Sequence, residues 1–401
     1  MPARIRLTLL TLLLLLVASC GGGGSRVDLS EGEADSLRYA TNLAIVRHDG
    51  WTEVRLRNPW DTVSVLHTYL LVPADGPVPA ALPEGTLVRT PLRRAGIATA
   101  VACGLVEELG RADAIAGVCE QQYIHQAVVQ QGLVEGTIAD FGNGMNPNVE
   151  QIMATQPDAL LLTPFEHSGG YGRVERLGIP IIECAEYMES SALGRAEWVR
   201  FYAMLFGAEA VGDSLFEAVE HDYLALRAAT APIASAAGSS HSLPTILPET
   251  MYGGQWFVPC AQSTMGRMYA DAGADYPFAD MAGSGSIGLS FEQVLDRAQD
   301  ADVWLIKYNQ SAPLTYAQLA RDYKPYTQFR AWRERRIWAC DLDATRFYEE
   351  TPFHPERLLR DLVIILHPEL MPGEETKYYK RLTDPSPLPS RGEQDEDGKE
   401  F

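Results

Sequence analysis

From Leu87 onward, short buried strands alternate with helices, and this alternation constrains the fold more than any other feature of the chain. Strands that alternate with helices at short spacing predict mostly parallel sheets covered by helices on both faces. Asn148 and Ser290 are the expected N-caps of two of the helices, and Gly110 is the expected end of another. The expected strands are the apolar runs at 114–118, 159–162, 179–182, 245–247, 303–306 and 336–339.

The pattern occurs twice. Residues 148–162 and 290–306 each read as a capped helix, an acidic turn and a buried strand. Between them lies a proline-free stretch with helical character, in which Gly207 and Gly212 are expected breaks and residues 213–229 are the candidate bridge. The sequence therefore predicts an α/β protein with two Rossmann-like lobes, 87–206 and 240–380, bridged by one long α-helix within 207–232.

The segment before the first lobe has a different pattern. Short β-rich runs between Tyr39 and Val72 are separated by turn residues, which predicts a small antiparallel hairpin or meander. Residues 38–86 are therefore expected to form a small N-terminal β extension. At the other end, residues 381–401 are Pro-rich and then charged, which predicts a disordered tail.

The first twenty residues predict an extracytoplasmic location. Arg4 and Arg6 precede an apolar run, and small residues then lead to Cys20. This order is typical of a signal peptide over 1–19. The cysteine resembles that of a bacterial lipobox, which implies acylation of Cys20 and a tether over 20–37; the alternative is a plain signal peptide with an incidental cysteine. We expect the protein in the periplasm or at the cell surface, attached to a membrane only through this lipid.

Composition excludes several classes of partner. The 401 residues contain 33 Lys and Arg against 53 Asp and Glu, a net charge of −20, which disfavours nucleic acid. Five cysteines remain after Cys20, so at least one thiol is unpaired or pairs with another chain. No C-x-x-C occurs and the eight histidines are scattered, so we expect no metal site and no resident cofactor. The G-x-G-x-x-G at 283–288 follows no clear strand, which disfavours a dinucleotide site.

Six short motifs occur in the order found in one known family. Between 87 and 370, the chain resembles the periplasmic binding proteins of ABC importers for iron–siderophores, haem and cobalamin. The resemblance implies a ligand held between two lobes, delivery to an ABC permease with its ATPase, and a monomer. The motifs are at 108–118, 148–162, 177–180, 272–273, 289–306 and 366–369.

The resemblance also raises the question of docking. Many members carry a permease-docking glutamate on each lobe, and the first-lobe position falls near Gly104, so Glu107 and Glu108 are the nearest candidates. The corresponding second-lobe region, 263–269, contains no acid. The docking mode of this chain is therefore expected to differ from the family pattern, although its negative charge would still steer association.

Aromatic and polar residues follow the carboxyl ends of the expected strands, where α/β proteins bind ligands. Flat rings suit a bulky metal chelate or macrocycle. Lys307 and Arg346 would pair with its anionic groups, Trp256 is expected beside it, and His167 is either an axial metal ligand or simply hydrogen-bonded. The predicted ligand-binding residues are Tyr123, Phe141, Asn143, Phe165, Glu166, His167, Tyr171, Tyr187, Tyr252, Trp256, Lys307, Tyr308, Arg346, Phe347 and Tyr348.

An iron–siderophore is the favoured ligand, with cobalamin or haem as the alternative. Two other classes of function remain open. One is a tetrapyrrole-processing enzyme resembling a chelatase, which would need converging titratable groups such as His167, Glu166 and Glu186. The other is a surface interaction protein that binds a partner through residues 39–85. Neither has a defining motif, and binding without covalent chemistry is the expected mechanism.

Overall fold

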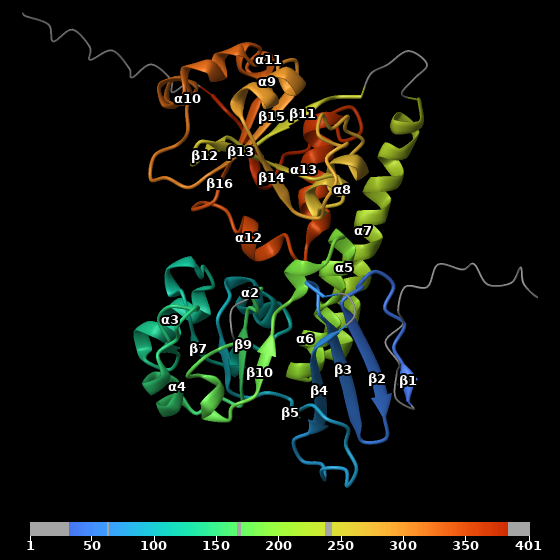
Figure 1. The fold of residues 1–401 in the computed structure, drawn as a ribbon, viewed down its shortest axis with the longest axis vertical. Coiled ribbons are helices and arrows are strands. Elements are labelled where there is room, and N and C mark those ends of the chain that lie inside the picture. Colours follow the sequence, from blue (N-terminus) through green and yellow to red (C-terminus); the bar gives the residue numbers. More distant parts are fainter. Residues whose placement is uncertain (1–31, 62–63, 167–169, 237–242, 384–401) are drawn as a thin grey trace, which may run out of the picture.

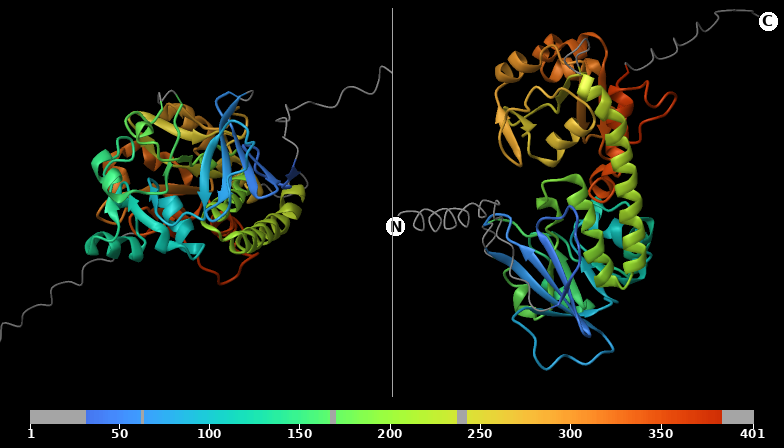
Figure 2. Two further views of the ribbon diagram at one scale, coloured as in Figure 1. Left: turned by 90° about the horizontal axis from the view of Figure 1, so that it is seen from below. Right: turned by 90° about the vertical axis from the view of Figure 1, so that its right-hand side faces the viewer.

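The computed structural model describes residues 32–61, 64–166, 170–236 and 243–383. The expected signal peptide, Cys20, His167 and most of the expected tail therefore lie outside the described residues. Two lobes lie one above the other in Figure 1, and one long helix runs alongside both. Figure 2 shows the same helix from the side. The two-lobe α/β architecture expected from the sequence is confirmed.

The N-terminal sheet has five strands in the order β1-β2-β3-β4-β5. Its first four strands are antiparallel, as expected for a meander, but β5 pairs parallel to β4. The strand at Leu87 and Val88 thus belongs to this sheet, and the first lobe begins later than expected. The bounds are β1 (Glu33–Ala34), β2 (Leu43–His48), β3 (Trp51–Arg57), β4 (Val65–Pro73) and β5 (Thr86–Thr90).

The first lobe contains a parallel sheet in the order β10-β9-β6-β7-β8. Asn148 caps α4 through its side chain, as expected, and Thr99 caps α2. The bounds are β6 (Ala95–Ile97), α2 (Ala100–Glu108), β7 (Ile115–Val118), α3 (Ala127–Glu135), β8 (Ala139–Asp140), α4 (Val149–Thr155), β9 (Ala159–Leu162) and β10 (Ile181–Glu183).

The helices α5 (Ala192–Glu197), α6 (Val199–Phe206) and α7 (Glu209–Ala236) lead from the first lobe to the second. Gly207 ends α6 with φ +63°, as expected, but the break expected at Gly212 is wrong because Gly212 lies inside α7. A Cβ built there would meet the Ala203 Cβ at 2.5 Å. The missing side chain therefore allows α6 and α7 to pack closely. Helix α7 continues past α13 and α8 of the second lobe, which makes it the helical bridge.

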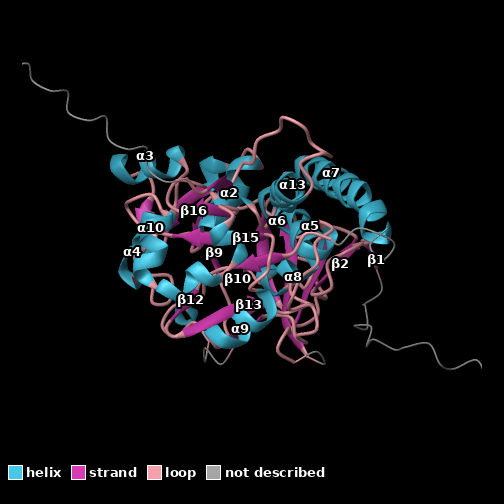
Figure 3. Cartoon of the chain, turned by 90° about the horizontal axis from the view of Figure 1, so that it is seen from above, coloured by secondary structure: helices cyan, strands magenta, loops and turns pink. Residues whose placement is uncertain are grey.

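The second lobe has two sheets, in the orders β11-β15-β16-β17 and β12-β13-β14. The first is parallel apart from β17, and the second is an antiparallel unit that the sequence did not predict. Figure 3 shows the chain from above, with α3, α4 and α10 on the left and α7 on the right. The bounds are β11 (Ile246–Pro248), β12 (Met251–Tyr252), β13 (Gln255–Pro259), α8 (Thr264–Asp271), β14 (Ser286–Leu289), α9 (Phe291–Ala298), β15 (Val303–Tyr308), α10 (Tyr316–Asp322), α11 (Arg330–Arg333), β16 (Ile337–Asp341), α12 (Phe347–Glu350), α13 (Pro355–Leu366) and β17 (Tyr379–Arg381).

Buried carboxylates attach both ends of the described chain to the lobes. Glu197 accepts the backbone N–H groups of residues 38–40, and Glu189 accepts those of Thr41 and Asn42. Asp361, on α13, accepts the N–H groups of residues 377–379 at the start of β17. Charged acceptors form the stronger class of hydrogen bond, so each carboxylate fixes several backbone groups at once. Arg381 therefore lies in an ordered strand rather than in the expected tail.

The five cysteines at 103, 119, 184, 260 and 340 are buried and form no disulfide. Burial raises the pKa of the Cys119 thiol to about 12 and that of Cys340 to about 11. In the part of the chain that the structure describes, no helix is long and apolar enough to cross a membrane.

Candidate functional site

The carboxyl ends of the strands in the two lobes face one another. His125 follows β7 of the first lobe, and its Nδ1 lies 2.6 Å from Oε1 of Glu349, which follows β16 of the second lobe. Because parallel strands end at a common edge, the segments after β7, β9 and β10 lie along the first-lobe side. The segments after β11, β15 and β16 lie along the second-lobe side. This is the edge at which the sequence predicts binding.

Four of the predicted aromatic side chains are exposed at these edges. Tyr123 and Phe165 follow strands of the first lobe and are 59% and 44% exposed. Tyr252 and Tyr348 follow strands of the second lobe and are 81% and 58% exposed. An exposed apolar patch is typical of a binding surface, and these four rings follow strands of both lobes.

The sequence reasoning missed two exposed apolar residues, Phe257 on β13 and Ile287 on β14. Met145, which follows β8 of the first lobe, is exposed as well. Phe257 occupies the same face of the small sheet as Tyr252, because Tyr252 pairs with Gln255, two residues away. The Gly253-Gly254 pair, with both φ values positive, is the signal that could have revealed this hairpin.

Trp256 is a correction to the sequence prediction. It pairs with Met251 on the opposite face of the hairpin and is fully buried. Its indole Nε1 donates to the Pro248 carbonyl at 2.8 Å, and its ring packs against Trp304 and Phe329. The strand register therefore places Trp256 in the core of the second lobe, where it does not reach a ligand between the lobes.

Phe141 and Phe347 are also buried rather than exposed to a ligand. The Phe141 ring lies over Gly117, where a Cβ would approach it to 2.2 Å, so it fills the space that two sheet glycines leave. Phe347 packs edge-on against Tyr378 and Tyr379. Both rings belong to the hydrophobic core, which contradicts their predicted contact with a ligand.

The two predicted cations have partners within the protein. Lys307 forms an ion pair with Glu249 and lies 5.6 Å from the centre of the Phe347 ring. Burial lowers the pKa of Lys307, but the negative charge of Glu249 outweighs it and the pKa is raised. Arg346 donates to the His125 carbonyl at 3.3 Å while its side chain stays half exposed. Of the two, Arg346 is the more accessible to an anionic group.

The remaining predicted residues make local contacts at the same edges. Tyr187 donates to the Pro164 carbonyl at 2.6 Å, and Tyr308 donates to Asp341 at 3.1 Å. The Asn143 side chain accepts from Met145 N at 2.9 Å within a turn. Glu166 is exposed after β9. Tyr171 lies beside Glu183, the last residue of β10.

Glu349 and His354 of the second lobe make polar contacts with the first lobe. Glu349, nearly buried, accepts from the backbone N–H and ring of His125 and from Gln126 Nε2 at 3.0 Å. His354 Nε2 lies 2.6 Å from Glu108 on α2. Glu349, Gln126, His354 and Glu108 line an inter-lobe crevice of about 150 Å³, together with Glu107 and Gly104. Glu108 is thus paired within the protein, and docking by Glu107 and Glu108 stays a prediction.

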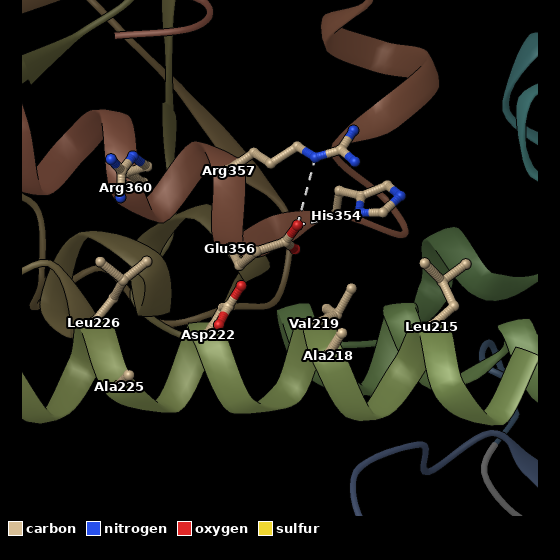
Figure 4. A pocket seen from close by; sticks show the side chains of 10 residues that line it. All are labelled: Leu215, Ala218, Val219, Asp222, Ala225, Leu226, His354, Glu356, Arg357 and Arg360. Carbon is tan, nitrogen blue, oxygen red and sulfur yellow. Dashed lines mark hydrogen bonds and ion pairs between the residues drawn. The ribbon is translucent and has the colours of Figure 1, made fainter. Parts of the chain in front are cut away.

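A groove of about 590 Å³ lies between α7 and α13 (Figure 4). Leu215, Val219 and Leu226 form its apolar side on α7. On the α13 side, Arg357 pairs with Glu356 and Arg360 with Glu374. These charges pair with one another, and the groove lies where the bridging helix meets α13 of the second lobe.

The described residues form no cluster of metal ligands at the site. Among residues 32–383, apart from the three short gaps, no three His, Cys, Asp or Glu side chains are placed to hold a metal ion. The buried Glu186, a member of the alternative catalytic group, accepts from Tyr202 Oη at 2.9 Å. Glu186 is thus buried, whereas Glu166 is exposed.

Residues 99–344 match the periplasmic binding protein family, and the chain belongs to this family. It is 26% identical over 369 residues to an uncharacterized lipoprotein of Methanocaldococcus jannaschii, covering 86% of this chain and 84% of that protein. A second uncharacterized lipoprotein of this organism is 22% identical over 86% of each chain.

Solved structures share the fold at lower sequence identity. A periplasmic haem-binding protein from Pseudomonas aeruginosa is 18% identical with a TM-score of 0.52, over 74% of this chain and 100% of that one. A protein of an Fe³⁺-hydroxamate transport system from Saccharomonospora viridis is 17% identical with a TM-score of 0.51, over 69% and 94%. These likenesses concern the fold.

Proposed function

We propose that this protein is a lipid-anchored extracytoplasmic solute-binding protein that holds a metal chelate, with an iron–siderophore favoured, between its lobes and delivers it to an ABC permease. The exposed rings of Tyr123, Phe165, Tyr252 and Tyr348 at the facing strand ends carry the proposal. Rings on both lobes match a bulky, rigid ligand that contacts both at once.

Similar structures support the chelate class without fixing its identity. One neighbour belongs to an Fe³⁺-hydroxamate transport system and another is a haem-binding protein, and they share the fold over 69% and 74% of this chain. Cobalamin or haem remains the alternative ligand. Arg346 is the candidate for pairing with an anionic group, since Lys307 already has Glu249 as its partner.

A binding screen tests the proposal. The mature chain from residue 20, with Cys20→Ser to keep it out of membranes, is titrated by calorimetry with ferric hydroxamates, ferric catecholates, haem and cobalamin. We expect one chelate to bind and the double variant Tyr252→Ala/Tyr348→Ala to weaken that binding by about tenfold or more, which is about 1.4 kcal/mol. Val211→Ala, an exposed change on α7, is the matched control. Failure of every chelate to bind, or full affinity in the double variant, contradicts the proposal.

The lipid anchor has a separate test. The two lipoproteins of Methanocaldococcus jannaschii support it, as does the Cys20 motif. Expressed with its leader, the wild-type chain is expected in the membrane fraction and in the detergent phase on phase separation. Cys20→Ala is expected in the aqueous phase, and an unchanged distribution would remove the lipid from the proposal.

A further inference from the structure

Three hydrogen-bonding side chains converge where the N-terminal sheet meets the first lobe. Glu183 is the last residue of β10, Tyr171 precedes that strand, and His67 lies on β4. Tyr171 Oη donates to Glu183 Oε1 at 3.3 Å, and His67 Nδ1 lies 3.7 Å from Glu183 Oε2. His67 is outside the residues that match the family, so the extension supplies one member of the cluster.

The carboxylate of Glu183 is not satisfied by its neighbours. Glu183 is 8% exposed, and its Oε2 has no hydrogen-bond partner among the residues that the structure describes. The 3.7 Å separation from His67 Nδ1 is longer than a hydrogen bond. An ionised carboxylate oxygen that is buried without a donor is costly, so this position favours either a proton or a donor that comes from elsewhere.

Among the residues that the structure describes, the groups around Glu183 carry no positive charge. Tyr171, Tyr69 and Cys184 all have pKa values raised by burial, and burial lowers the pKa of His67, which is neutral at pH 7. Burial also raises the pKa of Glu183 itself to about 7. The cluster therefore presents acceptors and a carboxylate that is ready to take up a proton or a cation.

His67 can present a ring lone pair to the same point. Its Nε2 lies 2.7 Å from Thr86 Oγ1, and when Nε2 carries the proton and donates it to Thr86, Nδ1 is left as an acceptor facing Glu183. Two acceptors 3.7 Å apart can each lie about 2.8 Å from one shared nitrogen. The Tyr171 oxygen is a third acceptor, which matches the three N–H bonds of an ammonium group.

We infer that His67, Tyr171 and Glu183 form a subsite for an ammonium group of the ligand held between the lobes. The inference rests on the proposed function for the rest of the ligand. Glu183 pairs in register with Leu162 of β9, so the subsite lies at the edge where Phe165 is exposed. The N-terminal sheet would then take part in binding, in addition to covering the first lobe.

The test uses n-butylammonium as the probe and n-butanol as its uncharged counterpart, at matched ionic strength. The carboxyl ¹³C signal of Glu183, assigned by its loss in Glu183→Gln, is followed in ¹³C-glutamate-labelled protein. We expect a saturable shift with n-butylammonium at about pH 8, weaker binding at about pH 6 where Glu183 is largely protonated, and no saturable shift with n-butanol.

Variants keep the inference falsifiable. Tyr171→Phe, which retains the ring, is expected to weaken n-butylammonium binding at least threefold, and Glu150→Gln, an exposed change, is expected to leave it unchanged. Absence of a saturable shift, an equal response to n-butanol, or full affinity in Tyr171→Phe would overturn the subsite. If a chelate binds but n-butylammonium does not, the subsite is contradicted and the proposed function stands. If n-butylammonium binds but no chelate does, the proposed function is contradicted and the subsite stands.

Discussion

His125 Nδ1 lies 2.6 Å from Glu349 Oε1, and this contact joins the two lobes although the residues are more than two hundred positions apart in the sequence. Glu349 also accepts from the His125 backbone and from Gln126, so one nearly buried carboxylate holds three donors of the opposite lobe. The relative position of the lobes depends on this contact as well as on the bridging helix.

Glu349→Gln is therefore expected to loosen the lobes. The amide replaces one carboxylate oxygen with a donor that faces other donors, which costs about 1–3 kcal/mol. Urea unfolding measures the free-energy change, and hydrogen exchange at residues 125–126 is expected to become faster. Glu334→Gln, an exposed change on the second lobe, serves as the control. Unchanged exchange at 125–126 would show that the contact does not hold the lobes.

The raised pKa of His354 predicts that the stability of the protein depends on pH. Burial lowers its pKa, but hydrogen bonds to Glu108 and Glu356 outweigh burial and raise the pKa to about 9. Because the folded pKa exceeds the unfolded one, protonation stabilises the fold fully below about pH 6.5, and this stability is lost as the pH rises towards 9; the difference is at most about 3 kcal/mol.

The measurement for His354 is the free energy of unfolding between these two pH values. His354→Gln is expected to flatten that part of the pH profile, whereas the exposed His221→Gln should keep its slope. A slope that persists unchanged in His354→Gln would assign the pH dependence to another group.

We expect the attachment of the N-terminal extension to depend on Glu197. It is fully buried and accepts three backbone N–H groups, so Glu197→Gln removes a charged acceptor and is expected to cost about 2–4 kcal/mol. Limited proteolysis should then cut near residues 38–42 sooner than in the wild type. Glu217→Gln, exposed on α7, is the control, and equal proteolysis of Glu197→Gln and wild type would contradict the predicted attachment.

We expect the substitution Gly212→Ala to change stability in the direction opposite to that given by helix propensity. Alanine inside a helix is favoured over glycine by about 1 kcal/mol, but here its Cβ would meet the Ala203 Cβ at 2.5 Å. Gly212→Ala is therefore expected to destabilise the protein, since α6 and α7 must separate. Gly104→Ala is the comparison, because only the end of the Gln126 side chain lies near, at 3.0 Å. Urea midpoints that rise in both variants would contradict the prediction.

Structural features that depend on residues close together in the sequence were predicted correctly. The cap at Asn148 and the capping box at Ser290 both form because side-chain oxygens accept N–H groups a few residues away. The alternation of strands and helices likewise gave the two lobes. Each of these features follows from short-range chemistry that a sequence carries directly.

Features set by distant contacts were not predictable. Trp256 and Tyr252 are four residues apart, yet one is buried and the other exposed, because the Gly253-Gly254 turn pairs their strands and puts them on opposite faces. Gly212 fits a helix interior only because Ala203 lies across from it. The unsatisfied oxygen of Glu183 depends on three segments that meet only in the folded chain.

The burial of all five described thiols has a consequence for how this protein folds. These five form no disulfide, so the described part of the chain can reach its native state without an oxidising catalyst. The same thiols are shielded from alkylating reagents while the lobes stay intact. Their modification would therefore report the opening of the fold directly, one cysteine at a time.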